Sequence, residues 1–222
     1  MKKSATLLSA AVAIGLMTGG ASADVIKVGV IGTMSGPYAL FGKNFKMGID
    51  AWVAEHGNKV GNHTIEFIYR DEESPNPAKS KALAQELLVK DKVQYLAGVY
   101  FTPDAMAIAP LLEESKTPLV VMNAATSSVT EKSPYIVRVS MTLPQGAWAM
   151  AKWAAENNIK SAYTLVADYG PGHDAEVQFK KTFTELGGKI VGEVRTPVNT
   201  ADYAAYLERV DRKSTRLNSS HT

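Results

Sequence analysis

Apolar stretches of strand length alternate with amphipathic stretches of helix length along most of this chain, and this alternation constrains its fold more than any other feature. Strands with high apolar content that are joined by amphipathic helices form a parallel sheet covered on both faces. The sequence therefore predicts an α/β fold. Strands are expected at 25–31, 64–69, 93–99 and 118–123, and helices at 43–56, 78–90 and 103–116, the last of them interrupted by Pro110.

The alternation restarts after an extended stretch at 135–142. Helices are then expected at 145–158, 172–187 and 201–210, and strands at 161–167 and 189–197. A second α/β lobe is the simplest reading, with the boundary between 135 and 145. The sequence predicts an N-terminal lobe at 24–141 and a partial second lobe at 142–211.

Both ends of the chain differ in character from the region between them. Lys2 and Lys3 precede an apolar run that is short for a membrane span, and "ASA" at 21–23 fits a cleavage site, so 1–23 is predicted to be a signal peptide. A membrane anchor is the alternative. The mature chain would start at Asp24 and be exported to the periplasm.

The last stretch, 212–222, reads "RKSTRLNSSHT" and lacks apolar periodicity. It is interpreted either as a disordered tail or as foreign sequence joined to a native helix. In the second case the second lobe is incomplete, and poor stability with weak binding is expected of the chain alone.

Composition excludes several classes of function. The formal net charge of +2 gives no electrostatic case for nucleic-acid binding. The absence of cysteine removes thiol catalysis and thiolate metal sites. No cofactor or metal is expected.

The glycines at the end of the first strand raise the question of a phosphate site. Gly29, Gly32 and Gly36 do not have the G-x-G-x-x-G spacing, and no P-loop motif occurs. Another kind of ligand is therefore more consistent with this turn.

Ligands of open α/β sheets bind beyond the carboxyl ends of the strands. Here the loops at those ends, 33–42, 100–104, 123–128 and 168–172, carry hydroxyls, small residues and aromatic rings. These groups suit a small polar solute that has an apolar part.

Three stretches, "IKVGVIGTMSGPYALFG", "AGVYFTPDAMAIAPLLEESKTPLVVMNAATS" and "DYGPGHDAEVQFKKTFTELGGKIV", are similar to the periplasmic solute-binding proteins of the branched-chain amino acid ABC transporter family. The resemblance runs from about 24 to 210. It implies a type I periplasmic-binding-protein fold, in which two doubly wound parallel-sheet lobes close around a ligand. The implied partners are a small-molecule ligand and a membrane permease, with the binding protein a monomer.

The resemblance also implies a set of site residues. The loop at Ala124, Ala125 and Thr126 would hold the ligand's carboxylate through backbone N–H groups and a hydroxyl, to which Thr102 would add a hydroxyl and a carbonyl. The walls of the pocket would come from the aromatic side chains of Phe41 and Tyr169, to which this chain adds Tyr100 and Phe101.

Two features distinguish this chain from a leucine-type binding protein. Tyr100 and Phe101 make the third loop more aromatic than such a pocket needs, and at most one of them is expected to face the cleft. The family's acidic partner for a ligand ammonium would lie beyond residue 210. The expected solute is thus an amino acid or a related aromatic acid or amide.

Other interpretations remain open at this point. Thr126 and Ser127 could cap a helix, and "DEE" at 71–73 is expected to be a solvated turn. The chain could be the sensory domain of a receptor or two-component system, which a downstream membrane span would favour. It could also be an exported hydrolase using His173 with Asp168 and Asp174, which turnover dependent on His173 would support.

Overall fold

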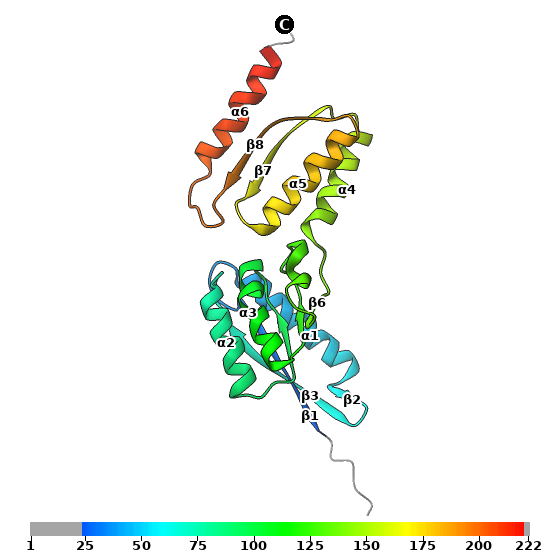
Figure 1. Cartoon of the computed structure of the whole chain (residues 1–222), viewed down its shortest axis with the longest axis vertical. Helices are drawn as coiled ribbons and strands as arrows, with labels where there is room; N and C mark the ends of the chain where they lie inside the picture. Colours follow the sequence, from blue (N-terminus) through cyan, green and yellow to red (C-terminus); the bar gives the residue numbers. More distant parts are fainter. Residues whose placement is uncertain (1–23, 220–222) are drawn as a thin grey trace, which may run out of the picture.

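The computed structural model describes residues 24–219, and the side chains of 24–211, as two α/β lobes stacked end to end (Figure 1). The first lobe contains the strands β1 Val25–Gly32, β2 Lys59–Val60, β3 His63–Asp71, β4 Tyr95–Gly98, β5 Leu119–Val121 and β6 Ile136–Arg138. Its helices are α1 Ala39–His56, α2 Pro77–Val89, α3 Thr102–Ser115 and the short 3-10 helix η1 Ser127–Glu131.

The six strands of the first lobe form one sheet in the order β2-β3-β1-β4-β5-β6. All neighbouring pairs are parallel except β2 with β3, which form an antiparallel hairpin. The first strand, β1, lies inside the sheet between β3 on one side and β4 on the other. The loops that follow β1 and β4 consequently diverge above the sheet, which is where open α/β sheets bind ligands.

Helices cover both faces of this sheet. A β-carbon on Gly29 would meet Leu87 of α2, whereas one on Gly32, which points to the opposite face, would meet Phe45 of α1. The main core lies between the sheet and the pair α2 and α3. Its fully buried members include Ile31, Leu87, Leu96, Ile108, Leu112, Leu119 and Val121.

The expected interruption of α3 at Pro110 is wrong. The helix runs unbroken from Thr102 to Ser115 with Pro110 inside it. Proline removes one intrahelical hydrogen bond. Ile108 and Leu112 on either side are fully buried, so tertiary packing holds the helix together across this position.

Gly98, the last residue of β4, has a backbone conformation with φ +101°, and a β-carbon there would collide with the Ile31 carbonyl of β1. Only glycine meets both requirements without strain. The residues that follow it, Val99 and Tyr100, are thereby directed out of the sheet into the loop before α3.

The second lobe comprises α4 Leu143–Glu156, β7 Ser161–Ala167, α5 Gly170–Glu185, β8 Lys189–Thr196 and α6 Ala204–Ser219. The strands β7 and β8 pair in parallel, and α4 packs against α5 over a small core of Ala151, Ala154 and Phe183. Thr142 and Gln145 form a capping box that begins α4. The last strand of the first sheet ends at Arg138 and α4 begins at Leu143, so a short extended stretch joins the two lobes.

The structure extends the last predicted helix toward the C-terminus. The α6 helix continues to Ser219, beyond the helix predicted at 201–210, which counts against the disordered-tail alternative over 212–219; arginine, lysine and leucine are good helix formers. The foreign origin of this tail stays a prediction. The predicted signal peptide, 1–23, and residues 220–222 lie outside the described residues. Over 24–219, none of the helices combines the length and the apolar character that crossing a membrane requires.

Candidate functional site

The loops after β1, β4 and β5 meet the first turn of α5 where the two lobes face each other, and Figure 1 shows the starts of α3 and α5 on the two sides of this junction. The sequence-predicted residues Phe41, Tyr100, Phe101, Thr102, Thr126 and Tyr169 come from these segments. Hydrogen bonds between Ser127 and Asp174 and between Tyr38 and Asn199 join the two lobes here. The junction is therefore the candidate site.

A pair of threonine hydroxyls lies at the centre of the junction. The Thr126 hydroxyl donates to Thr102 Oγ1 at 3.0 Å, and the Thr126 N–H points to the same oxygen at 3.4 Å. Both threonines are buried. Because Thr102 Oγ1 accepts from Thr126, the Thr102 hydroxyl proton is directed elsewhere and can donate to a ligand.

Two helix N-termini converge on these hydroxyls. Thr102 is the first residue of α3, and Gly170, the first residue of α5, lies so close that a β-carbon on it would be 2.6 Å from Thr126 Oγ1. The N-terminus of a helix carries partial positive charge and free N–H groups. Two such ends at one point favour an anion there.

The guanidinium of Arg138, which sequence reasoning missed, lies behind this loop. Its Nη1 donates to the carbonyls of Ala124 at 3.1 Å and Thr126 at 2.6 Å. The side chain fixes the backbone of the loop and adds a positive charge close to the threonines. Its position on β6, twelve residues after Thr126, gave no local signal in the sequence.

The two alanines of the loop differ in what they can offer a ligand. Ala124 is fully buried and its N–H donates to the Val99 carbonyl at 3.3 Å, so the implied use of this N–H is not what the structure presents. The Ala125 N–H has no hydrogen-bond partner among the described residues, and its carbonyl accepts from Leu143 at 3.1 Å. Ala125 is the alanine whose N–H remains available.

Aromatic rings surround the threonine pair on the side of the first lobe. Phe41 stacks on Tyr100 with 3.9 Å between ring centroids, and Tyr100 meets Phe101 edge-on at 4.5 Å. Tyr38, which sequence reasoning did not single out, meets Phe101 edge-on at 4.9 Å. Phe101 is almost fully buried, whereas Tyr100 is half-buried. That at most one of the two faces the cleft stays a prediction.

The hydroxyls of Tyr38, Tyr100 and Tyr169 lie near one another. Burial, with the neighbouring Tyr169 and Tyr38, raises the pKa of Tyr100 to about 12. Burial, followed by Tyr38, raises the pKa of Tyr169 as well. The phenols of Tyr100 and Tyr169 therefore stay neutral and can donate hydrogen bonds at physiological pH.

Two further hydrogen bonds connect the lobes. Asp174 of α5 accepts from both the N–H and the hydroxyl of Ser127 at 2.8 Å. The Tyr38 hydroxyl donates to Asn199 Oδ1 at 3.3 Å. The capping interpretation of Thr126 and Ser127 is wrong, because neither hydroxyl caps η1 and both are used in the contacts just described.

The expectation of a solvated turn at 71–73 is also wrong. Glu72 is fully buried, and Asp71 Oδ1 accepts from the N–H groups of Met34 at 2.7 Å and Glu73 at 2.8 Å. Asp71 thus fixes the loop after β1 from the neighbouring strand. The turn is part of the support of the site.

His173 and Asp168, the pair considered for a hydrolase, are hydrogen-bonded at 2.7 Å at the start of α5, and both are largely exposed. Asp174 is engaged by Ser127 instead. Among the described residues no group of three or more potential ligands could hold a metal ion.

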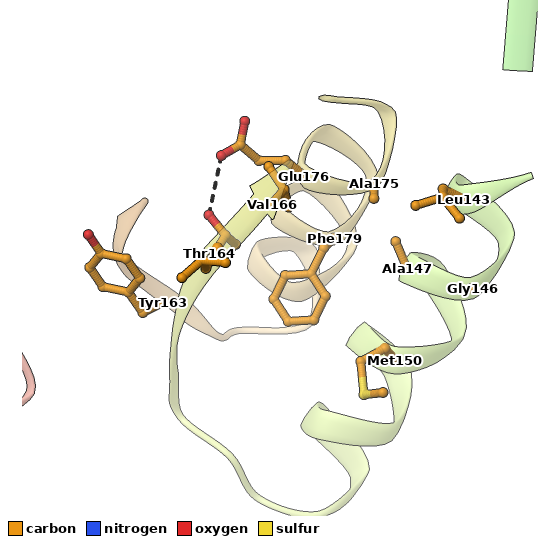
Figure 2. A pocket seen from close by; sticks show the side chains of 11 residues that line it. Leu143, Gly146, Ala147, Met150, Tyr163, Thr164, Val166, Ala175, Glu176 and Phe179 are labelled. Carbon is orange, nitrogen blue, oxygen red and sulfur yellow. Dashed lines mark hydrogen bonds between the residues drawn. The ribbon is translucent and has the colours of Figure 1, made fainter. Parts of the chain in front are cut away.

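A separate apolar pocket of about 410 Å³ lies in the second lobe between α4, β7 and α5 (Figure 2). Phe179 and Met150 line it. Its buried carboxylate, Glu176, is engaged by the Thr164 hydroxyl at 3.3 Å and by Arg195 at 2.6 Å. With its acid already satisfied and its walls apolar, this pocket resembles a packing surface more than a site for a polar solute.

A family model described as "Periplasmic binding protein" matches residues 25–214. The chain belongs to the periplasmic binding protein family. A Leu/Ile/Val-binding protein homolog 6 from Brucella abortus is 55% identical over 95% of this chain and 53% of its own length.

Solved structures of solute-binding proteins of ABC transporters are also similar. One from R. palustris in complex with 4-hydroxybenzoate has a TM-score of 0.84 and 66% identity, over 86% of this chain and 52% of that one. Another, from Rhodopseudomonas palustris BisB5 in complex with 3,4-dihydroxybenzoic acid, has a TM-score of 0.82 and 44% identity over the same shares.

These similarities confirm the type I periplasmic-binding-protein fold expected from the sequence. The chain spans about half the length of the curated relatives it matches. The relatives are solute-binding proteins rather than enzymes, and membership of the family implies an extracytoplasmic location.

Proposed function

We propose that this chain forms the ligand-binding first lobe and part of the second lobe of the periplasmic solute-binding component of an ABC importer, and that its solute is a small aromatic carboxylate. The protein captures the solute by closure of the cleft, as a monomer and without catalysis or a cofactor, and presents it to a membrane permease. Capture by closure fits the direct hydrogen bonds between the lobes at Ser127 and Tyr38.

The observation that carries this proposal is the stacked pair Phe41 and Tyr100 beside the threonine hydroxyls. A flat ring gains stacking or edge contacts of about 0.5–1.5 kcal/mol beyond its buried area. An aliphatic side chain such as that of leucine gains only the free energy of burying its apolar area. The wall of the site thus favours a planar solute.

The anionic end of the solute is assigned to the threonine pair. There the Thr102 hydroxyl, which accepts from Thr126 and keeps its own proton for a ligand, lies beside the Ala125 N–H and the starts of α3 and α5, with Arg138 behind them. Hydrogen bonds to a carboxylate are charge-assisted and stronger than neutral ones. The ring would then extend toward Phe41, Tyr100 and Tyr169.

The printed ligands of two relatives support the same class. The similar proteins from R. palustris are in complex with 4-hydroxybenzoate and 3,4-dihydroxybenzoic acid. Both molecules join a planar ring to a carboxylate. The name of the Brucella relative, by contrast, refers to leucine, isoleucine and valine.

Isothermal titration calorimetry with 4-hydroxybenzoate, 3,4-dihydroxybenzoate, benzoate and leucine tests the proposal. The protein in the calorimeter cell is the longest natural polypeptide that contains this sequence. We expect the hydroxybenzoates to bind and leucine to bind at least tenfold more weakly, about 1.4 kcal/mol. Tighter binding of leucine, or binding of none of the acids, would overturn the proposal.

A variant pair sharpens this test. Tyr100→Leu should weaken binding of the aromatic acids, because it removes the ring that stacks on Phe41. The affinity for free leucine should not change. Tyr95→Leu is the matched control, since Tyr95 begins the strand β4 that precedes the Tyr100 loop and its side chain is exposed. Equal effects of the two substitutions would remove Tyr100 from the site.

A further inference from the structure

Two buried carboxyl groups lie directly beneath the loop that carries Tyr100 and Thr102. Glu72 follows β3 and Asp104 stands in the first turn of α3, and both are 0% exposed. Glu72 Oε2 accepts from the Ser80 hydroxyl at 2.8 Å, and its carboxylate also accepts from the Tyr100 N–H. Asp104 Oδ1 accepts from the Asn76 N–H at 3.1 Å. Each acid thus joins the loop after β3 to the segment that forms the site.

The remaining oxygen of each acid has no partner among the described residues. Glu72 Oε1 and Asp104 Oδ2 are both buried and make no hydrogen bond. Two ionised carboxylates with unpaired oxygens in one buried place would be costly, whereas one proton gives the pair a donor and removes one of the charges.

The surrounding charges do not relieve this pair. Asp71, the neighbour of Glu72, is acidic, and the Lys79 ammonium is engaged by Glu73 at 2.6 Å. Burial, and then the charge of Glu72, raises the pKa of Asp104 to about 7. Burial also raises the pKa of Glu72, against the hydrogen bonds from Ser80 and Tyr100 and the weaker effect of Lys79.

We propose that Glu72 and Asp104 hold one proton between them, and that this proton keeps negative charge away from the Thr102–Thr126 anion site. The link to the anion site rests on the proposed function; the shared proton does not. Asp104 comes two residues after Thr102 in the same helical turn, so its ionisation would set a second negative charge against a bound carboxylate. Both acids are positioning residues, which act on the solute through the loop and its field.

The first experiment uses no solute. A group whose pKa is raised by folding binds more proton in the folded state than in the unfolded state, so the free energy of unfolding should fall as pH rises between about pH 4 and pH 7, with a slope near one proton. Urea unfolding at a series of pH values measures that slope. Asp104→Asn supplies a neutral donor in place of the acid and should abolish it.

Glu114→Gln is the matched control, because Glu114 is exposed on the same helix and its loss should leave the slope unchanged. Equal slopes for the parent and Asp104→Asn would overturn the shared proton. If Asp104→Asn does not fold, infrared spectroscopy of the parent protein tests the shared proton instead. The band of a buried protonated carboxyl should be present near pH 6 and lost above about pH 8. Absence of the band would also overturn it.

The second experiment adds 4-hydroxybenzoate at pH values from about 6 to 8, over which its carboxylate stays ionised. The parent's affinity should fall as pH rises through about 7, and that of Asp104→Asn should stay nearly constant. An affinity in the parent that does not change with pH would overturn the link between the acids and the site. Absence of binding at every pH would count against the proposed function alone. The shared proton would still be tested by the pH dependence of the free energy of unfolding.

Discussion

A β-carbon on Gly170 would lie 2.6 Å from the Thr126 hydroxyl oxygen, so the start of α5 reaches the centre of the first lobe's loops only because this residue is glycine. The φ angle of Gly170 is not in the left-handed region, so its backbone would accept alanine. The glycine is therefore required by the approach of the two lobes and not by the helix it begins.

Gly170→Ala should weaken solute binding at least tenfold, because closure would bring the new methyl group against the Thr126 hydroxyl. Titration calorimetry measures the loss. Gly146→Ala in α4 is the control: nothing lies within 4 Å of its β-carbon, so the helix should gain about 0.5–1 kcal/mol and affinity should not change. Undiminished binding by Gly170→Ala would mean that the lobes do not close at this contact.

Thr126→Ala should weaken binding of the carboxylate by about 1–3 kcal/mol, because it removes the hydrogen bond that turns the Thr102 hydroxyl proton toward a charged ligand in a buried site. The measurement is again the dissociation constant. Thr184→Ala, at an exposed position of α5, is expected to bind as the parent does. If Thr126→Ala retains full affinity, Thr126 does not contact the solute.

Asp174→Ala should loosen the connection between the lobes. Its carboxylate accepts both the N–H and the hydroxyl of Ser127, so without it the Ser127 amide should exchange its hydrogen faster. Hydrogen exchange followed by mass spectrometry over the loop measures this directly. Glu185→Ala on the same helix serves for comparison, and equal exchange in the two variants would show that the contact is not formed in solution.

Gly98→Ala should destabilise the first lobe more than Gly61→Ala. Both glycines have positive φ, for which alanine costs about 1–2 kcal/mol, but only at Gly98 would the methyl group also meet the Ile31 carbonyl. Urea unfolding gives both values. Similar losses would show that β1 shifts to accommodate the added atom.

The sequence predicted the alternation of strands and helices because apolar strands and amphipathic helices have different periods. Most predicted elements agree with the structure to within a few residues. The sequence-based prediction was wrong at Pro110, where core packing outweighed a local helix-breaking preference. It also placed the start of α1 four residues too late, since the helix begins at Ala39. Local preference cannot report what a distant part of the chain contributes.

The same limit applies to the site. The loops could be placed at one edge of the sheet, and Thr102 and Thr126 do meet there. Arg138 and Glu72 could not be found, because a basic residue in a short strand and an acidic residue in a polar turn look like surface charges. The burial of Glu72 and the contacts of Arg138 depend on strands that are neighbours in the sheet but not in the sequence.

The convergence of α3 and α5 on the threonine pair, with Arg138 behind it, has a consequence for the order of events in capture. Helix termini and a guanidinium act on a charge over distances up to about 8–10 Å in salt solution, whereas stacking on Tyr100 begins only at contact. Charge would therefore discriminate between solutes while they approach, and shape only once they contact the site. Neutral molecules with a fitting ring would bind poorly because no electrostatic attraction acts on them, although the site has room for the ring.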